Sequence, residues 1–409
     1  MLDSGHLARP KATEVAVIYV SHFAPNPIGH GGNHRTYQIV HDLKSVLPER
    51  VVVVSLPEWR QSRPTGAPTP NPLMRFARRM QRRLVRYAEN PYKLLAHTPY
   101  TTGIYRDPEF ANYYKELIQQ VPKPALCIIE HTGFADVIKI NAQYGIPTVC
   151  CIQNLEAFDL GVLDHNNRWE IYARAVDFAN EFRVLAQCAE RLFISRVEAG
   201  LISGLGLSSH YYPYVPVGAI RQHIEWIRRE RSKGQIESSL FLMLGSAGHS
   251  TTRASFAWFI QNAQKYGLPK GVQVVVCGSQ TDRLLPAGDQ VPGLELRGWL
   301  EQDVLEQLLI RAKAVLVPQR SGFGAITRLP EMACAGVPVI ASRHSVYAID
   351  PTPGLYIVED SWDAWYTAME QVAKEDVSPS AIDYSAWEEK QPKTLQIVVE
   401  RLLTGSCQK

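Results

Sequence analysis

Long hydrophobic runs are missing from this sequence of 409 residues, and its first residues lack an apolar stretch. No run approaches the roughly 20 apolar residues that span a bilayer, and the opening MLDSGHLARPKATE has no signal-peptide core. The 7 cysteines contain no pair with the two-residue spacer of redox or zinc motifs. We therefore expect a cytoplasmic protein with reduced thiols, no bound metal and no membrane-spanning segment.

An excess of charge of one sign is also absent, because 43 Lys and Arg face 40 Asp and Glu, a net charge of +3. This balance argues against nucleic acid as a partner, and any basic site has to be local. The 45% hydrophobic and 20% charged residues are typical of a folded globular protein. At roughly 150 residues per domain, the length predicts two or three domains.

Short runs of Val, Ile, Leu and Cys alternate with amphipathic stretches along most of the chain, which is typical of βαβ units. A polar, Pro-containing segment, 208–239, is interpreted as the connection between two domains. The sequence therefore predicts an α/β fold with two parallel sheets and ligands at the carboxyl ends of their strands. The strands are expected at 15–20, 51–56, 126–130, 147–152 and 191–195, and at 240–244, 272–277, 294–297, 314–317 and 337–341.

Two glycine-bearing loops are the strongest candidates for a binding site. In the first, Gly29, Gly31 and Gly32 precede a predicted helix, and the free amides of a helix N-terminus favour an anion such as phosphate. His34 stands where a dinucleotide-binding G-x-G-x-x-G motif needs its third glycine, so that motif is excluded. An ordinary turn between strand and helix is the alternative.

The second loop lies in residues 315–342, where a strand, a glycine loop and a helix follow one another. Gly322 and Gly324 allow the loop backbone conformations that other residues rarely adopt. Arg328 and Glu331 lie three residues apart on one face of the helix. An arginine suits the oxygens of a diphosphate, and a carboxylate suits the hydroxyls of a sugar. The pair predicts a nucleotide-sugar site, the alternative being an ordinary surface ion pair.

These motifs resemble the donor-binding domain of glycosyltransferase family 4. The matching stretches include FLMLGSAGHSTTRASFAWFIQNA, VQVVVCGS and GFGAITRLPEMACAGVPVIAS, with looser similarity in CIIEHTG and VCCIQNLE nearer the N-terminus. The resemblance implies the GT-B fold, two facing Rossmann-like parallel-sheet domains with a cleft between them. It also implies transfer of a sugar from a nucleotide diphosphate sugar to an acceptor hydroxyl with retention of configuration. No cofactor besides this donor substrate is implied.

On this resemblance, residues 1–220 form the acceptor domain and residues 221–384 the donor domain, and a helix within about 385–409 packs back on the first. It gives Gly322 and Gly324 to the donor loop, and Gly31 and Gly32 to the loop that approaches the donor phosphates. The implied catalytic residues are His131 near the transferred sugar, Arg328 in place of a phosphate-binding lysine, and Glu331 at the ribose. Further donor-binding candidates are Gly245, Arg253, Gly298, Trp299 and Arg320.

The sequence departs from the family pattern in the second loop. Ala325 and Ile326 replace the usual Thr-Arg after the glycines, and Phe323 occupies the position of a first glutamate. A phosphate ligand is therefore missing or replaced by Arg253 or Arg320. Two rival functions stay open: a nucleotide-sugar epimerase on the same fold, and a non-catalytic homologue that binds sugar nucleotides.

Several residues carry two interpretations. His131 either faces the sugar or is a strand-end histidine bound to backbone. Asn154 and Glu156 either touch the acceptor or cap a helix, and Trp299 either stacks on a base or packs in the protein.

A run of arginines interleaved with apolar residues occupies LMRFARRMQRRLVRY, residues 73–87. At helical spacing, Phe76, Met80, Leu84 and Tyr87 form one apolar stripe. Peripheral contact with an anionic membrane is one interpretation, and a solvated helix over the sheet is the other. The arginines concerned are Arg75, Arg78, Arg79, Arg82, Arg83 and Arg86.

Overall fold

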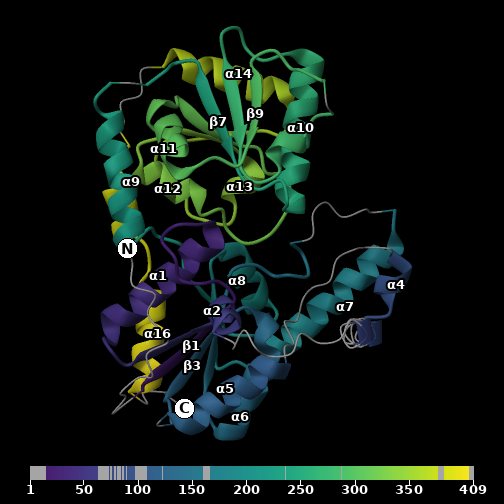
Figure 1. Ribbon diagram of the computed structural model, residues 1–409, viewed down its shortest axis with the longest axis vertical. Helices are drawn as coiled ribbons and strands as arrows, with labels where there is room; N and C mark the ends of the chain where they lie inside the picture. The colour runs from purple at the N-terminus through teal and green to yellow at the C-terminus, as the bar shows by residue number, and fades with distance from the viewer. Residues whose placement is uncertain are drawn as a thin grey trace.

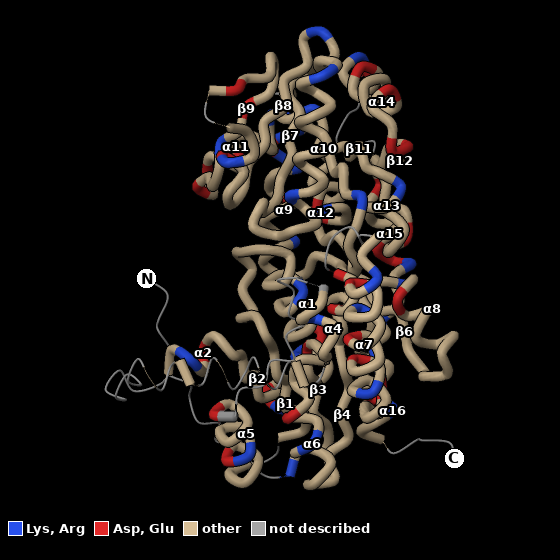
Figure 2. Tube along the Cα trace, turned by 90° about the vertical axis from the view of Figure 1, so that its right-hand side faces the viewer, with Lys and Arg blue, Asp and Glu red and all other residues tan. Residues whose placement is uncertain are grey.

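The computed structural model consists of two lobes stacked along the long axis of the molecule (Figures 1 and 2). Charged residues of both signs are spread over both lobes, in keeping with the small net charge. The structure describes residues 15–62, 90–96, 108–121, 123–159, 166–234, 236–286, 288–375 and 382–404, together with seven positions between 73 and 88.

The first lobe is built on a six-stranded sheet in which every strand pairs in parallel with its neighbours. Its inner strands are runs of Val, Ile, Leu and Cys that are buried on both faces, as parallel strands covered by helices require. The order is β2-β1-β3-β4-β5-β6, with β1 at Val17–Ser21, β2 at Val51–Ser55, β3 at Leu126–Glu130, β4 at Thr148–Ile152, β5 at Glu190–Phe193 and β6 at His210–Tyr211.

Helices cover both faces of this sheet. One face packs against α1 (Gly31–Val46) and the last helix of the chain, α16 (Thr394–Leu403), through side chains such as Ile39 and Leu395. The other face packs chiefly against α5 (Pro108–Gln120) and α6 (Ala135–Tyr144). The remaining elements of this lobe are α2 (Leu56–Gln61), α4 (Tyr92–Ala96), η1 (Thr132–Phe134), α7 (Arg168–Leu185) and α8 (Arg196–Gly204).

The second lobe repeats the design with another six-stranded parallel sheet. The strand order is β12-β11-β10-β7-β8-β9, so the chain reverses its direction of winding between β7 and β10, where such sheets bind ligands. The strands are β7 (Leu240–Leu244), β8 (Gln273–Cys277), β9 (Leu294–Gly298), β10 (Ala314–Val317), β11 (Val339–Ser342) and β12 (Leu355–Val358).

One face of the second sheet packs against α9 (Gly218–Arg231), α11 (Gln302–Arg311) and α12 (Arg328–Cys334). The other face packs against α10 (Ser250–Tyr266) and α14 (Trp362–Lys374), with Trp365 fully buried. The short elements η2 (Thr281–Arg283), α13 (Arg343–Val346) and α15 (Ser385–Glu389) complete this part of the chain.

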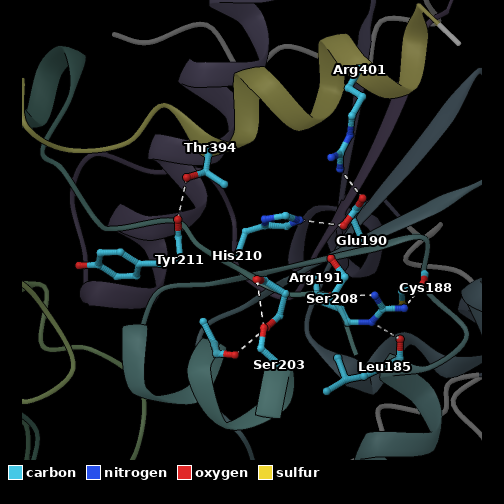
Figure 3. A network of polar contacts seen from close by, with 12 residues as sticks. Leu185, Cys188, Glu190, Arg191, Ser203, Ser208, His210, Tyr211, Thr394 and Arg401 are labelled. Atoms are coloured by element: carbon cyan, nitrogen blue, oxygen red, sulfur yellow. Dashed lines mark hydrogen bonds and ion pairs between the residues drawn. The ribbon is translucent and has the colours of Figure 1, made fainter. Parts of the chain in front are cut away.

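The last helix, α16, lies against the first lobe and is tied to its sheet by polar contacts (Figure 3). Glu190 on β5 accepts a hydrogen bond from the guanidinium of Arg401 on α16. The Glu190 carboxyl oxygen Oε2 also lies 2.9 Å from Nε2 of His210 on β6. The Thr394 hydroxyl donates to the carbonyl oxygen of Tyr211 over 2.6 Å. The chain therefore passes from the second lobe back onto the first.

The predicted α/β fold with two parallel sheets is confirmed, and ten of its strands lie where the sequence pattern places them. Two strands were missed. β6 has only two residues, inside the polar segment interpreted as a connection, and α9 follows in that same segment. β12 is a partly exposed edge strand of four residues, LYIV, whose apolar run was not assigned as a strand.

Six cysteines in the described residues are buried and form no disulfide. Within the same part of the chain, no helix has the length and apolar character needed to cross a bilayer.

Candidate active site

The N-terminus of α1 meets the N-terminus of α12 where the two lobes touch (Figure 1). His30 caps α1, because its ring accepts the Gly32 amide over 3.1 Å while the Asn33 side chain accepts the His30 amide. A Cβ atom added at Gly31 would lie 2.5 Å from Oγ1 of Thr327, which directly precedes α12. The missing side chain at Gly31 thus lets the two lobes approach closely.

Glu331 on α12 contacts two side chains of the first lobe. Its Oε1 lies 2.7 Å from Nδ1 of His34, on the second turn of α1, and accepts the Tyr214 hydroxyl over 2.8 Å. Burial lowers the pKa of His34, but the charge and hydrogen bond of Glu331 outweigh it and raise the pKa above its usual value. Glu331 is therefore held in a charge-assisted contact between lobes.

Arg328 begins α12 and is half-buried. Its Nη2 lies 3.3 Å from the place where a Cβ would stand on Gly245, at the end of β7. Its guanidinium makes no hydrogen bond or ion pair with any residue that the structure describes. Burial lowers the pKa of Arg328, and the Glu331 charge opposes this effect. A shielded guanidinium without a fixed partner is suited to an anionic ligand.

The other two cations proposed as phosphate ligands are held by groups of the second lobe. Arg253 on α10 is exposed and donates through Nε to the carbonyl oxygen of Ala247 over 2.7 Å. Arg320 lies 3.5 Å from Asp360 and covers the ring of Trp258.

The glycine loop at 322–324 is held by carboxyl groups of the first lobe. Glu198 on α8 accepts the amide of Gly324 over 2.9 Å and, through its other oxygen, the amide of Leu155 over 2.5 Å. Asp159 accepts the amide of Phe323 over 3.3 Å. Burial raises the pKa of Glu198 to about 8, although its amide and Ser195 hydrogen bonds act in the opposite direction. Two amides of the loop thus donate hydrogen bonds to side-chain carboxyl groups of the first lobe in this arrangement.

Glycine is required in this loop by its backbone. Gly322 and Gly324 have φ values of +103° and +80°, and a Cβ on Gly324 would lie 2.5 Å from the carbonyl oxygen of Gln153. Phe323, at the position of the family's first glutamate, packs on Phe158 of the first lobe.

His131 follows β3 with a φ of +88°, a conformation that is strained for a residue with a side chain. Its buried ring lies with Nδ1 3.1 Å from Oε1 of Glu156. Burial lowers the pKa of His131 to about 4, against the charge of Asp159. Burial and Asp159 together raise the pKa of Glu156 to about 7. At neutral pH, His131 is therefore an uncharged imidazole.

Asn154 donates to Asp159 over 2.7 Å, and Asp159 lies 3.4 Å from Nε2 of His249, the residue that precedes α10. Asp159 thus contacts Asn154, the glycine loop and the start of α10, and its charge acts on the pKa of both His131 and Glu156. In the described part of the chain, no group of three or more His, Cys, Asp and Glu side chains is arranged to hold a metal ion.

Gly298 and Trp299 lie at the end of β9. Gly298 has a φ of +69°, and its amide donates to Thr281 over 3.1 Å. Trp299 is 73% exposed, so the interpretation that it packs inside the protein is wrong. Its stacking on a base stays a prediction.

The six arginines of the run at 73–87 lie outside the described residues. Of the predicted apolar stripe, Phe76, Met80 and Leu84 are exposed and Tyr87 is partly buried, and Leu73 just before the arginines is exposed as well.

The sequence singled out Gly31, Arg328 and Glu331, and the structure brings these residues together at the lobe junction. It did not assign roles to His34, Tyr214, Asp159 or Glu198, which complete the junction from the first lobe. An available signal was the presence of polar residues such as Glu198 within otherwise apolar segments.

The two six-stranded parallel sheets with flanking helices form the GT-B fold. Residues 238–375 match the model of the family described as Glycosyl transferases group 1. This match confirms, for the second lobe, the glycosyltransferase resemblance found in its motifs. No curated protein matches the sequence.

Solved structures with the same fold cover 95 to 97% of this chain. Sucrose-phosphate synthase from Thermosynechococcus elongatus aligns with a TM-score of 0.60 and 13% identity, covering 95% of this chain and 97% of that one. The structure of Anabaena HepE in complex with UDP and glucose aligns with a TM-score of 0.56 and 10% identity, covering 95% of this chain and 100% of that one. The catalytic domain of starch synthase IV from Arabidopsis thaliana, bound to ADP and acarbose, aligns with a TM-score of 0.56 and 13% identity. The alignment covers 97% of this chain and 100% of that one. These likenesses establish the fold.

Proposed function

We propose that this protein transfers a sugar from a nucleoside diphosphate sugar to an acceptor hydroxyl with retention of configuration. The observation that carries this proposal is the guanidinium of Arg328, half-buried beside Gly245 and free of hydrogen bonds to any described residue. The family match of the second lobe supports it. So do UDP in the HepE structure and ADP in the starch synthase structure.

In this proposal, Arg328 and the amides at the start of α10 bind the diphosphate, and Glu331 binds the ribose. Cations and helix N-termini stabilise the negative charge that grows on the diphosphate as the bond to the sugar breaks. Oε2 of Glu331 makes no hydrogen bond to a described residue and can accept from ribose hydroxyls. Trp299, exposed at the end of β9, is the proposed stacking partner of the base.

The chemical step exchanges one carbon–oxygen bond for another at the anomeric carbon of the sugar. The bond to the diphosphate breaks, the acceptor oxygen bonds to the same face, and the acceptor proton passes to the departing diphosphate. Because His131 is uncharged at neutral pH, it is a positioning group for the sugar and not the proton donor. The step uses no metal and no further cofactor, so chelation is expected to leave the rate unchanged.

Two variants test the proposal because their roles differ. Glu331→Gln removes a charged acceptor of ribose hydroxyls, so the donor should bind more weakly and its KM should rise. The expected loss of binding free energy is about 1 to 3 kcal/mol. Arg328→Met removes a cation that faces charge in the transition state, so kcat should fall more than affinity. Arg283→Met is the matched control, since Arg283 is an exposed arginine beside Asp282. Wild-type transfer by Arg328→Met would refute the site.

We also propose peripheral contact with anionic lipid through residues 73–87. Leu73, Phe76, Met80 and Leu84 are exposed at spacings of three or four residues, and arginines alternate with them in the sequence. An exposed apolar stripe flanked by basic residues is typical of helices that lie in a membrane interface.

A further inference from the structure

Arg328 and Glu331 are neighbours on one face of α12, yet they are not paired with each other. Opposite charges three residues apart on a helix ordinarily attract and form an ion pair. Here no ion pair joins the two side chains, both of which the structure describes. The reason lies in the first lobe, since Oε1 of Glu331 is bound instead by His34 and Tyr214.

His34 and Tyr214 approach Glu331 from two different segments. His34 is on α1, whose start is fixed against Thr327 by the close approach at Gly31. Tyr214 is 2% exposed and lies between β6 and α9, where the chain passes from the first lobe to the second. His34 changes position relative to α12 if the lobes separate, and Tyr214 directly follows Tyr212 and Pro213, whose carbonyl oxygens accept hydrogen bonds from Arg35 of α1. The contact of His34 with Glu331 therefore exists only while the lobes are together, and Tyr214 adds a second contact from the segment that joins them.

We propose that His34 and Tyr214 are positioning residues that hold Glu331 away from Arg328, so that contact between the lobes prepares both residues for the donor. With Glu331 held, the Arg328 guanidinium is left for the diphosphate and Oε2 of Glu331 for the ribose. Without the two first-lobe contacts, Glu331 pairs with Arg328 and both ligand groups are consumed. This inference rests on the proposed function and adds the coupling of lobe contact to donor binding.

Inorganic pyrophosphate is the probe that separates the two effects, because it needs Arg328 and has no ribose. In the double variant His34→Leu, Tyr214→Phe, we expect its affinity to fall at least about fivefold, the lower end of typical coupling between sites. Adding Glu331→Gln to that double variant removes the competing carboxylate and should restore the affinity. A loss caused by general damage to the fold would not be restored by a third substitution.

Two further variants complete the test by calorimetry on the full chain. His34→Asn keeps a nitrogen donor near the position of Nδ1 and should keep the affinity, while His41→Leu, on the same helix and half-exposed, is the matched control. Thermal unfolding reports whether each variant is folded. Failure of the triple variant to recover affinity would overturn this inference. If Arg328→Met leaves pyrophosphate affinity unchanged in the parent protein, the donor site itself is refuted, which distinguishes the two failures.

Discussion

Gly31→Ala should impair the protein although alanine is the better helix former. A Cβ at this position would lie 2.5 Å from Oγ1 of Thr327, about 0.9 Å closer than the 3.4 Å of an ordinary contact. Thr327 is β-branched, so it has little rotamer freedom with which to relieve the clash. Overpacking of this kind costs about 1 to 3 kcal/mol, which corresponds to a loss of roughly 5- to 150-fold in donor affinity if the lobes have to separate.

The assay is calorimetric titration with UDP, ADP and GDP, using whichever binds the parent most tightly. Thr327→Ala in the Gly31→Ala background removes both nearest atoms and leaves the Thr327 Cβ position at 3.5 Å, so binding should recover. Gly200→Ala is the matched control, because a Cβ at Gly200 on α8 meets nothing within 4 Å. Unchanged binding by Gly31→Ala, or no recovery in the double variant, would refute the close approach of α1 and α12 in the functional state.

Two further predictions concern the pH dependence of stability and the membrane. Because burial raises the pKa of Glu198 to about 8, above the value of an unfolded glutamate, its contribution to stability is full below about pH 4.5 and is lost as the pH rises through about 8. The unfolding free energy of the parent should thus fall more steeply with pH over this range than that of Glu198→Gln, with a difference in slope of at most about 1.4 kcal/mol per pH unit. Chemical denaturation at several pH values measures both slopes, and equal slopes would contradict this prediction. Flotation with vesicles should show binding that requires anionic lipid and weakens with salt, since exposed charges are screened beyond about 10 Å at 0.1 M salt; equal binding to neutral vesicles, or none, would contradict the proposed role of the arginines.

The sheets could be predicted from the sequence because their signal is local. A run such as that of β3, Leu126–Glu130, is short, apolar and buried on both faces, and its predicted bounds match the structure. β6 could not be predicted, because two residues in a polar segment carry no periodicity. It forms through pairing with β5, which is a tertiary interaction.

Residues of the candidate site that are close in the sequence could likewise be predicted, whereas contacts between distant segments could not. Arg328 and Glu331 share one helical turn, so their spacing alone marks them as a pair. His34 and Glu331 are 297 positions apart, and Glu198 and Gly324 are 126 apart. Contacts of this kind depend on how two separately folded sheets come together, and neither periodicity nor a local motif encodes that arrangement.

The central claim is that Arg328 binds the diphosphate of the donor at the junction of the lobes. Titration of the parent protein and of Arg328→Met with nucleoside diphosphates, followed by calorimetry, tests it most directly. We expect at least one of UDP, ADP and GDP to bind the parent, and the same nucleotide to bind Arg328→Met at least about tenfold more weakly, the loss expected for a charged hydrogen bond. Equal affinity of the two proteins, or no binding to the parent, would contradict the account.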